Sequence, residues 1–419
     1  MEAFEQLALI WAGVLVAVWA AKHTRLTPVL YYLAVGAILV NAGLLPETPH
    51  EFIRGFAEIG ILLIMFAIGF EEQANNFIAS MRRSWGIALF GAIAPFAAAY
   101  AVTWYFWQNF AVALMAGLAM TATAVSLTMV ALKAEGLAAS PPATRIMTSA
   151  VLDDIGSLAL VAIMVPIAKG GDFPGAVDLL IMIGKVVVFF SIVTVLGNWV
   201  FPHDSKSWVA RIPGLRYFNM RGILRFEKGE YAVLILLLLA MVTGLTAHAF
   251  GFHPAVGAYM AGLIIREEYF DYDDTRDLAA YRDVKRLVDN VAFSWIGPVF
   301  FVLLGAHLIF TWETFVAVIP QTVILTVALF VSQVASAALA ARYTGGLAFA
   351  GSMLVGFGML GRAELAFVVL DIAYVQNRIL PEETFYALMF SCFWLNVAVP
   401  LTIRWWKPYY QKEVGFGTT

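Results

Sequence analysis

Two adjacent carboxylates, Asp153 and Asp154, lie inside an apolar run that extends from about Ile146 to Ile167. Neighbouring residues of a helix point about 100° apart, so the two carboxylates cannot both serve one narrow face. A carboxylic acid that is removed from water and placed beside a like charge holds its proton more readily than in solution. Its oxygens are also hard ligands that suit a dehydrated alkali cation. The pair therefore favours a site for either a proton or a cation, with one carboxylate facing a water-filled cavity and the other a neighbouring helix.

The composition places these carboxylates in a membrane. The chain is 61% hydrophobic and 13% charged, whereas about a quarter of the residues in a soluble domain are charged. Apolar stretches of roughly the 20 residues that span a bilayer recur at 4–21, 26–45, 55–70, 85–106, 110–132, 146–168, 176–201, 230–250, 253–265, 290–310, 314–341, 346–375 and 384–403. The sequence thus predicts an all-α polytopic membrane protein with about 13 transmembrane helices.

The loops predict the orientation of these helices, because Lys and Arg collect in cytoplasmic loops. Basic residues fall on alternate loops, with Arg54, Lys169 and Arg378 as exceptions. The first apolar stretch lacks a basic region before it and opens with Glu2 and Glu5, so it is predicted to be a retained helix. We expect a multi-pass protein of the cell inner membrane with its N-terminus outside and its C-terminus in the cytoplasm.

Two of the predicted helices contain interruptions. Residues 118–130 read LAMTATAVSLTMV, and residues 354–369 read LVGFGMLGRAELAFVV. The two lie seven helices apart, so two six-helix halves on either side of one extra helix would be inverted repeats. Matched broken helices in inverted repeats indicate a transport site near the membrane midplane. The hydroxyls of the first interruption, Thr121, Thr123 and Ser126, are candidate cation ligands, although small hydroxyl residues also serve helix packing.

The other polar groups in the spans are ranked lower. An ionisable group at bilayer depth costs at least about 2.5–3.5 kcal/mol, so it indicates function by default. The aspartates could instead pair with bases and only hold helices together, but Arg362 is the principal deep cation. Four further groups are predicted to be structural: Glu58 and Glu230 at helix starts, Asp371 at a solvated helix end, and His307 as a satisfied histidine at a helix end. The functional alternatives are that Asp371 lines an external funnel and that His307 tunes the pH response.

Several other functions are disfavoured by the sequence. Gly356, Gly358 and Gly361 spell GxGxxG, but inside a membrane span rather than between a strand and a helix. The net charge of −3 gives no indication of nucleic acid, and the basic stretch 203–228 favours a linker helix on an anionic membrane surface. The single Cys392 excludes an intrachain disulfide. We find no spacing typical of a metal site or a nucleophile with its base, and we expect no cofactor.

Six segments together resemble the monovalent cation:proton antiporters, in the branch that contains Kef-type and Nap-type sodium/proton exchangers. They read AEIGILLIMFAIGFE from Ala57, TATAVSLTMVALKAEG from Thr121, AVLDDIGSLALVAI from Ala150, GFHPAVGAYMAGLI from Gly251, GPVFFVLLG from Gly297 and GRAELAFVV from Gly361. The resemblance covers nearly the whole chain in order. The double aspartate after a broken helix is its most specific element.

The resemblance implies a homodimer in which a core domain with two crossing broken helices moves against a dimerisation domain. The corresponding ranges are 1–70 and 230–310 for dimerisation, 85–168 and 314–407 for the core, 176–228 for the linker and cytoplasmic loop, and 408–419 for a cytoplasmic tail. It implies that Asp154 binds the proton and the cation, that Asp153 pairs with a lysine, and that Arg362 and Glu364 compensate charge at the second broken helix. Paired aspartates in this family usually accompany electrogenic exchange.

The sequence departs from this family at one position. Gln333 stands where the family often has the lysine that pairs with the first aspartate. Three alternatives follow: Asp153 titrates on its own, Arg362 compensates it, or Gln333 donates a neutral hydrogen bond to it.

The expected function is a secondary antiporter that exchanges Na⁺ or K⁺ for H⁺ by alternating access, embedded in membrane lipid. An alternative is the membrane module of a gated K⁺ efflux system. A membrane-embedded enzyme is disfavoured, because no catalytic constellation supports it. Selectivity among Na⁺, K⁺ and Li⁺ depends on cavity geometry, which the sequence does not define.

Overall fold

A computed structural model describes residues 3–24, 26–71, 74–170, 220–224, 226–270, 279–309, 311–362 and 364–416, together with a few positions between 177 and 192. All regular secondary structure in these ranges is helical. This is the expected architecture for a chain in hydrocarbon, where every backbone polar group needs a partner within the protein. The predicted linker over 176–228 lies largely outside the described residues.

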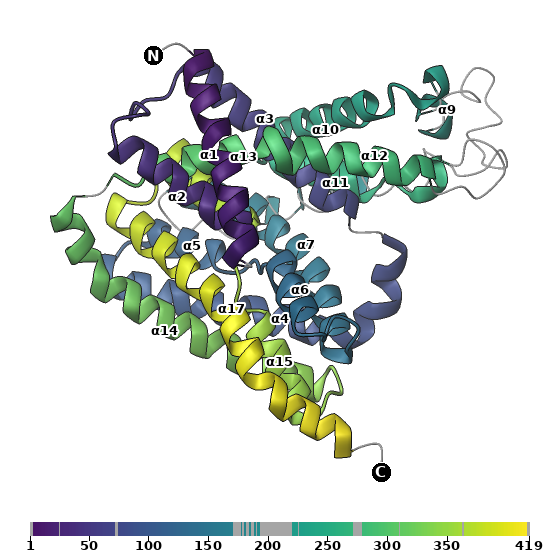
Figure 1. Ribbon diagram of the computed structural model, residues 1–419, viewed down its shortest axis with the longest axis vertical. Helices are drawn as coiled ribbons and strands as arrows, with labels where there is room; N and C mark the ends of the chain where they lie inside the picture. The colour runs from purple at the N-terminus through teal and green to yellow at the C-terminus, as the bar shows by residue number, and fades with distance from the viewer. Residues whose placement is uncertain are drawn as a thin grey trace. The chain divides into compact units, whose positions relative to one another are not determined.

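The helices follow the predicted apolar stretches (Figure 1). Their bounds are α1 Ala3–Thr24, α2 Pro28–Asn41, α3 Glu51–Glu71, α4 Ala74–Trp107, α5 Phe110–Ala119, α6 Val125–Ala134, α7 Pro141–Gly170, α9 Met220–Leu224, α10 Ala232–Ala249, α11 Pro254–Leu263, α12 Ala279–Asn290, α13 Gly297–Ala306, α14 Trp312–Tyr343, α15 Phe349–Gly358, α16 Glu364–Asp371 and α17 Glu382–Phe416. In the described ranges eight helical stretches are long and apolar enough to cross a membrane, and α2, α5 and α15 are shorter apolar helices. The all-helical membrane fold is confirmed, while the count of 13 stays a prediction.

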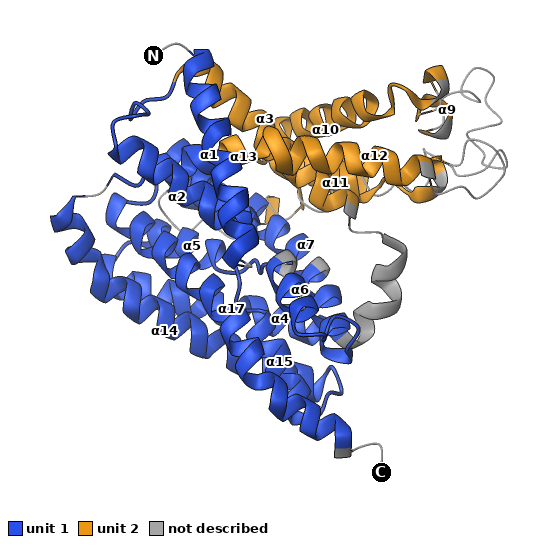
Figure 2. Cartoon of the chain, viewed as in Figure 1, with its two compact units in different colours: residues 1–49, 76–174, 301–419 blue, residues 50–75, 175–300 orange. Residues whose placement is uncertain are grey.

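The chain divides into two compact units (Figure 2). Unit 1 comprises residues 1–49, 76–174 and 301–419, and unit 2 comprises residues 50–75 and 175–300. The two units are defined by contacts within one chain. The predicted domains are defined by dimer formation and by movement during transport, which such contacts do not test. The predicted domain assignment therefore stays a prediction.

Unit 2 is built around close helix packing. Helix α3 packs against α10 and α11. A Cβ atom on Gly69 of α3 would overlap the carbonyl oxygen of Tyr259 on α11, so glycine permits the two backbones to approach closely.

In unit 1, both predicted interruptions are present. The first lies between α5 and α6, and the second between α15 and α16. We call residues 120–124 the first break and residues 359–362 the second break. Each divides an apolar stretch into two half-helices, and each thereby exposes helix-end backbone groups that need partners.

Some element ends differ from the predicted ones. Helix α3 begins at Glu51 rather than at 55, so Glu58 lies within the helix and not at its start, which corrects the prediction for that residue. The predicted stretch 290–310 is preceded by the amphipathic helix α12 and begins with a π-helical turn, Val291–Trp295. Helix α17 continues to Phe416, well past the apolar stretch.

The extension of α17 is held by polar contacts within unit 1. The carboxylate of Glu413 accepts hydrogen bonds from the backbone N–H groups of Ala350 (3.1 and 3.0 Å) and Gly351 (3.2 Å) at the start of α15. Lys407 forms an ion pair with Glu135 at 3.1 Å. Hydropathy does not report such contacts, which is why the sequence placed the helix end too early.

Candidate functional site

The two breaks contact each other directly. The N–H of Ala124 in the first break donates a hydrogen bond of 2.9 Å to the carbonyl of Gly361 in the second. The hydroxyl of Thr128 on α6 donates to the carbonyls of Ala124 and Gly358. The breaks thus satisfy part of each other's backbone, which is the condition under which non-helical backbone is tolerated at membrane depth.

A glycine is required where the breaks meet. A Cβ atom on Gly361 would lie 2.9 Å from the Cβ of Ala124 and 3.2 Å from Oδ1 of Asn396. Of the glycines that spell GxGxxG, Gly356 and Gly358 therefore lie in the half-helix α15, and Gly361 lies in the second break.

A polar stripe on α7 runs beside both breaks. Its members, Ser149, Asp153 and Ser157, are spaced by four residues and so share one helix face. Oγ of Ser149 lies 3.8 Å from the sulfur of Met359 in the second break, and Oγ of Ser157 donates to Oγ1 of Thr121 in the first break at 3.1 Å. The four-residue spacing is visible in the sequence and could have identified the two serines, which the sequence analysis missed.

Asp153 is the carboxylate of the pair that binds the first break. Its Oδ2 accepts hydrogen bonds from the backbone N–H of Thr123 at 3.2 Å and from the hydroxyl of Thr123 at 3.0 Å. Asp153 is 2% exposed, and its Oδ1 has no hydrogen-bond partner in the described part of the chain. Asp154 follows on a different helix face and is half-buried. The two carboxylates thus differ in burial, and the predicted division of their roles stays a prediction.

The three candidate cation ligands of the first predicted interruption have different positions. Thr121 and Thr123 contact the α7 stripe, and the hydroxyl of Thr121 also donates to the carbonyl of Leu118 at 2.7 Å. The side chain of Ser126 lies outside the described residues. The structure therefore brings two of the three predicted hydroxyls to the aspartate helix.

The second break contains its own charged groups. Arg362 is fully buried, and its Nη1 donates to the carbonyls of Met359 (3.2 Å), Leu360 (3.2 Å) and Gly361 (3.0 Å), which follow the end of α15. A cation at a helix C-terminus complements the helix dipole. Glu364 is the first residue of α16, where a carboxylate is favoured for the same reason.

Gln333 on α14 binds Arg362 rather than Asp153. Its Oε1 accepts from Nη2 of Arg362 at 2.7 Å, and its Nε2 donates to the carbonyl of Gly91 at 3.1 Å. Among the described residues, no direct ion pair joins Asp153 and Arg362. Both functional groups of the Gln333 amide are thus occupied without Asp153, whose hydrogen bonds come from Thr123.

Asn396 on α17 is a further site residue that the sequence analysis missed. It is fully buried, its Oδ1 accepts from the N–H of Arg362 at 2.9 Å, and its Nδ2 donates to the carbonyl of the same residue at 2.7 Å. The side-chain amide thus supplies hydrogen bonds to the N–H and the carbonyl of Arg362, which lie outside a helix and have no helical backbone partner among the described residues. A lone asparagine in the apolar stretch 384–403 was the available signal.

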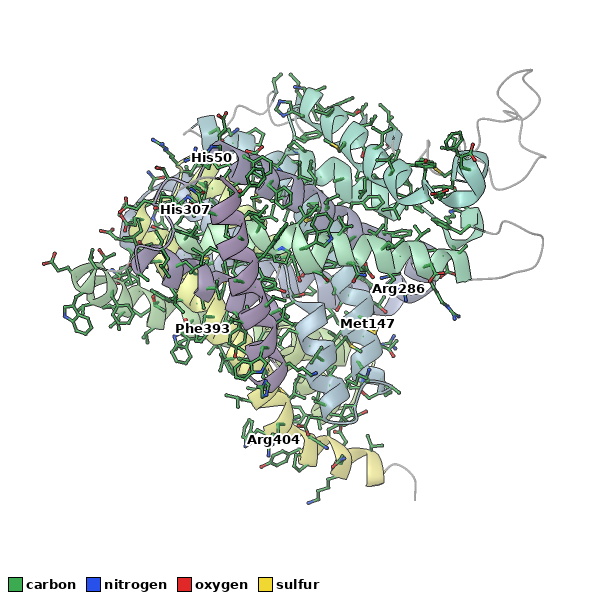
Figure 3. All side chains as sticks on the ribbon, turned by 45° about the horizontal axis from the view of Figure 1, so that its top comes forward. His50, Met147, Arg286, His307, Phe393 and Arg404 are labelled. Atoms are coloured by element: carbon green, nitrogen blue, oxygen red, sulfur yellow. The ribbon has the colours of Figure 1, made fainter. Side chains whose placement is uncertain are left out.

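The lower-ranked groups lie apart from the breaks. His307 follows the end of α13 and its Nδ1 lies 2.8 Å from the carbonyl oxygen of Leu303, as predicted. Asp371 is 8% exposed and accepts from Nε2 of Gln376 at 2.7 Å, so the prediction of a solvated helix end is wrong. The reason is a π-helical turn, Ile372–Gln376, that continues α16. Figure 3 places His307 toward one end of α17 and Arg404 toward the other, with Phe393 between them.

Known proteins and one protein family are similar to most of this chain. Residues 11–406 match the family described as "Sodium/hydrogen exchanger, transmembrane". The chain is 25% identical over 404 residues to the Na(+)/H(+)-K(+) antiporter GerN of Bacillus cereus, covering 96% of each protein. It is 27% identical over 283 residues to the glutathione-regulated potassium-efflux system protein KefC of Cronobacter sakazakii, covering 66% of this chain and 42% of that protein.

A solved structure shares the fold. The sodium proton antiporter MjNhaP1 of Methanocaldococcus jannaschii superposes with a TM-score of 0.68 at 13% identity, over 96% of this chain and 98% of that one.

Proposed function

This chain belongs to the sodium/hydrogen exchanger family, and from this premise we propose that it is an antiporter in which a monovalent cation and a proton compete for Asp154. The exchanged cation is Na⁺ or K⁺, in keeping with the Na(+)/H(+)-K(+) antiporter GerN as a relative. The family consists of transporters, so a membrane-embedded enzyme is set aside.

The observation that most supports this proposal is the contact of Asp153, the neighbour of Asp154 on α7, with the first break, which in turn binds the second. Asp153 binds Thr123 in the first break, and that break binds the second through Ala124 and Gly361. Backbone carbonyls, threonine hydroxyls and a carboxylate are thus gathered within one part of unit 1. Oxygen ligands of this kind suit a dehydrated alkali cation.

The two aspartates have separate roles in this proposal. Asp153 is a positioning residue, because it is almost fully buried and holds the first break through Thr123. Asp154 binds the transported ions, because it is half-buried and so is more accessible to water and cations. The residues differ by about 100° around α7, which lets one hold the break while the other exchanges ligands.

Competition at one carboxylate couples the two fluxes. Cation binding requires the ionised carboxylate, and protonation releases the cation. We further propose that the predicted core ranges, 85–168 and 314–407, move against a dimeric scaffold formed by 1–70 and 230–310, exposing Asp154 to each side in turn. The proposed setting is the lipid of a cell inner membrane, with the N-terminus outside.

The test is proton-coupled cation exchange in proteoliposomes with an internal pH dye. Asp154→Asn keeps the size of the side chain and removes the ionisable group, so exchange falls to the level of protein-free vesicles. The matched control is Asp283→Asn, which makes the same chemical change at an exposed residue of α12 whose carboxylate pairs only with Arg286 among the described contacts. Normal exchange by the Asp154 variant would overturn the proposal.

A second candidate function, the membrane module of a gated K⁺ efflux system, is favoured by the similarity to KefC. The two candidates differ in coupling. An antiporter moves protons in a fixed ratio to the cation, whereas a conductive pathway does not. Parallel measurement of K⁺ and H⁺ flux in the same vesicles distinguishes them.

A further inference from the structure

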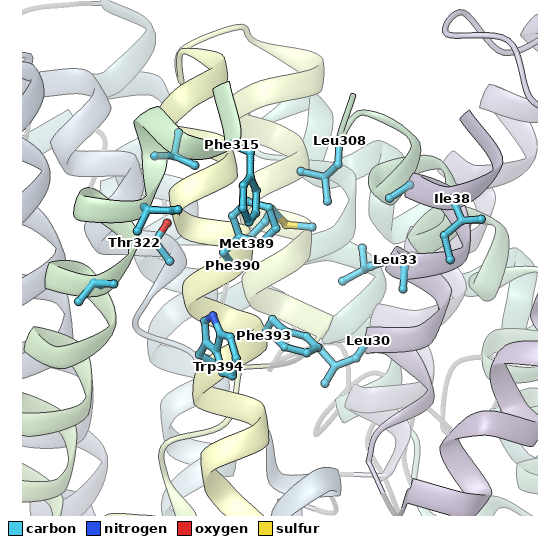
Figure 4. Close-up of a pocket in the computed structure, with 15 residues that line it drawn as sticks. Leu30, Leu33, Ile38, Leu308, Phe315, Thr322, Met389, Phe390, Phe393 and Trp394 are labelled. Carbon is cyan, nitrogen blue, oxygen red and sulfur yellow. The ribbon is translucent and has the colours of Figure 1, made fainter. Parts of the chain in front are cut away.

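A pocket of about 610 Å³ lies between α2, α14 and α17 within unit 1 (Figure 4). Its walls include Leu33 on α2, Phe315 and Val318 on α14, and Phe390 and Phe393 on α17. Of the 15 lining residues in this described part of the chain, Thr322 alone is not hydrophobic. The volume falls within the range of roughly 300–1,000 Å³ typical of small-molecule sites.

The pocket is at membrane depth. Helix α14 begins at Trp312, which is 78% exposed, and tryptophan favours the membrane–water interface. Thr322 follows ten residues later, which is about 15 Å along a helix axis. That distance is about half of the roughly 30 Å hydrocarbon core. Thr322 therefore lies near the level at which lipid chains are purely hydrocarbon.

The mouth of the pocket faces outward from the helices. Ile38, Val323 and Trp394 line it and are 64%, 54% and 55% exposed, one from each of the three helices. In a bilayer such side chains contact lipid tails. The contents of the pocket must therefore come from the hydrocarbon that surrounds its mouth.

The chemistry of the lining selects among possible occupants. A water molecule needs two to four polar partners, whereas the polar groups of the lining side chains are the hydroxyl of Thr322 and the indole N–H of Trp394 at the exposed mouth. An empty pocket would forgo the dispersion contacts of its walls. A flexible hydrocarbon chain forms these contacts and needs no hydrogen bond. We propose that this pocket binds one acyl chain of a membrane phospholipid.

Thr322 provides a way to challenge that assignment. It is 6% exposed, and its hydroxyl has no hydrogen-bond partner among the described residues. The oxygen itself is closed off from a water-sized group, so a polar ligand that displaces its neighbours gains a hydrogen bond there, whereas an acyl chain gains none. The nearly isosteric change Thr322→Val therefore distinguishes an acyl chain, whose binding it leaves unchanged or strengthens, from a polar amphiphile, whose binding it weakens.

Acyl-chain binding has a consequence for transport that rests on the proposed function. Helix α2 lies in the range assigned to the scaffold, whereas α14 and α17 lie in the range assigned to the moving core. An acyl chain bound between these helices must change its conformation when they shift. Occupancy of the pocket therefore limits the rate of exchange.

The test uses proteoliposomes that contain phosphatidylcholine with a photoreactive diazirine at the middle of one acyl chain. Crosslinked residues are identified by mass spectrometry after illumination. We expect crosslinks at the pocket to exceed those on the outer face of α14 around Val327, which is 56% exposed and outside the pocket. Equal labelling of both places indicates ordinary surrounding lipid and overturns the proposal.

Two tryptophan substitutions form a matched pair. Ala34→Trp adds bulk at an exposed position of the pocket, and Val327→Trp adds an aromatic ring on the outer face of α14. We expect the first to reduce pocket crosslinking about tenfold, the effect of about 1.4 kcal/mol in binding, and the second to leave it unchanged. An unchanged yield for Ala34→Trp, or a reduced yield for Thr322→Val, overturns acyl-chain binding.

The same vesicles test the effect on rate. The pH-dye assay should show slower exchange for Ala34→Trp than for Val327→Trp. The indole ring is attached to the backbone and cannot rearrange as a flexible acyl chain does when the helices move. Equal rates overturn the proposed effect on transport. Crosslinking requires no transport, so pocket labelling in a protein without exchange contradicts the proposed function alone, and exchange without pocket labelling contradicts lipid binding alone.

Discussion

The two breaks lie against each other, yet their helix ends are compensated differently. In the second break, Arg362 donates to the carbonyls that follow α15, and Glu364 begins α16. In the first break the negative group comes from another helix, as Asp153 on α7. Among the described residues, no cationic side chain donates to the final carbonyls of α5, where the hydroxyl of Thr121 binds Leu118.

This difference suggests separate tasks. A helix C-terminus is stabilised by a cation, and in the second break that cation is a permanent part of the chain. The first break lacks an equivalent resident cation in the described structure, which supports the proposal that an exchangeable ion binds beside it. In this proposal the charge that compensates the second break is permanent, whereas the charge that compensates the first break is exchangeable. Four substitutions test this distinction.

The largest effect is expected for Arg362→Gln. This change removes a fully buried charge that donates to three carbonyls and to Gln333. Each hydrogen bond to a charged group is worth about 1.5–3 kcal/mol, and this change removes several at once, so the loss exceeds that of a single bond. Thermal unfolding in detergent should show that loss together with loss of exchange. Wild-type stability would contradict a structural role for the resident cation.

A smaller effect is expected for Gln333→Lys, which introduces the residue common in the family. Here Gln333 accepts from Arg362, and an ammonium group cannot accept. The change removes a hydrogen bond to a charged group, worth about 1.5–3 kcal/mol, and adds a like charge. We expect lower stability and no gain of transport current on a solid-supported membrane, whereas Gln333→Glu keeps the acceptor. A stable Gln333→Lys protein with increased current would show that this pairing is dispensable.

Gly361→Ala tests the close approach of the two breaks. The added methyl would lie 2.9 Å from the Cβ of Ala124, and overpacking of this kind costs about 1–3 kcal/mol. Gly55→Ala on α3 is the control, because a Cβ there meets nothing within 4 Å. We expect the control to retain stability and exchange. Equal behaviour of the two variants would show that the breaks can separate without cost.

The smallest effect is expected for Thr123→Val. This change removes one of two hydrogen bonds to Asp153 and leaves the backbone N–H in place. The loss of stability should be about 1 kcal/mol, typical of a single hydrogen bond. Because the charge that compensates the first break is the exchangeable one in this proposal, cation affinity in the exchange assay should change more than stability does. A change in stability with unaltered cation dependence would assign Thr123 to packing alone.

Much of the fold could be predicted from local patterns. Apolar stretches of bilayer length located the helices, and glycines with hydroxyl residues located both breaks. Element ends were less predictable, because α3 and α17 extend beyond their apolar cores. The polar stripe of α7 was also present as a four-residue spacing, but only contact with the breaks reveals its importance.

The sequence by itself determined that Asp153, Asp154 and Arg362 are ionisable groups within apolar stretches, because apolar residues surround them along the chain. Only the tertiary structure decided their partners. Thr128 and Gly358 are 230 residues apart in the chain and yet share a hydrogen bond. Gln333 and Asn396 hold Arg362 from two other helices. Local periodicity is set by backbone geometry and membrane thickness, whereas such partners depend on how distant helices pack.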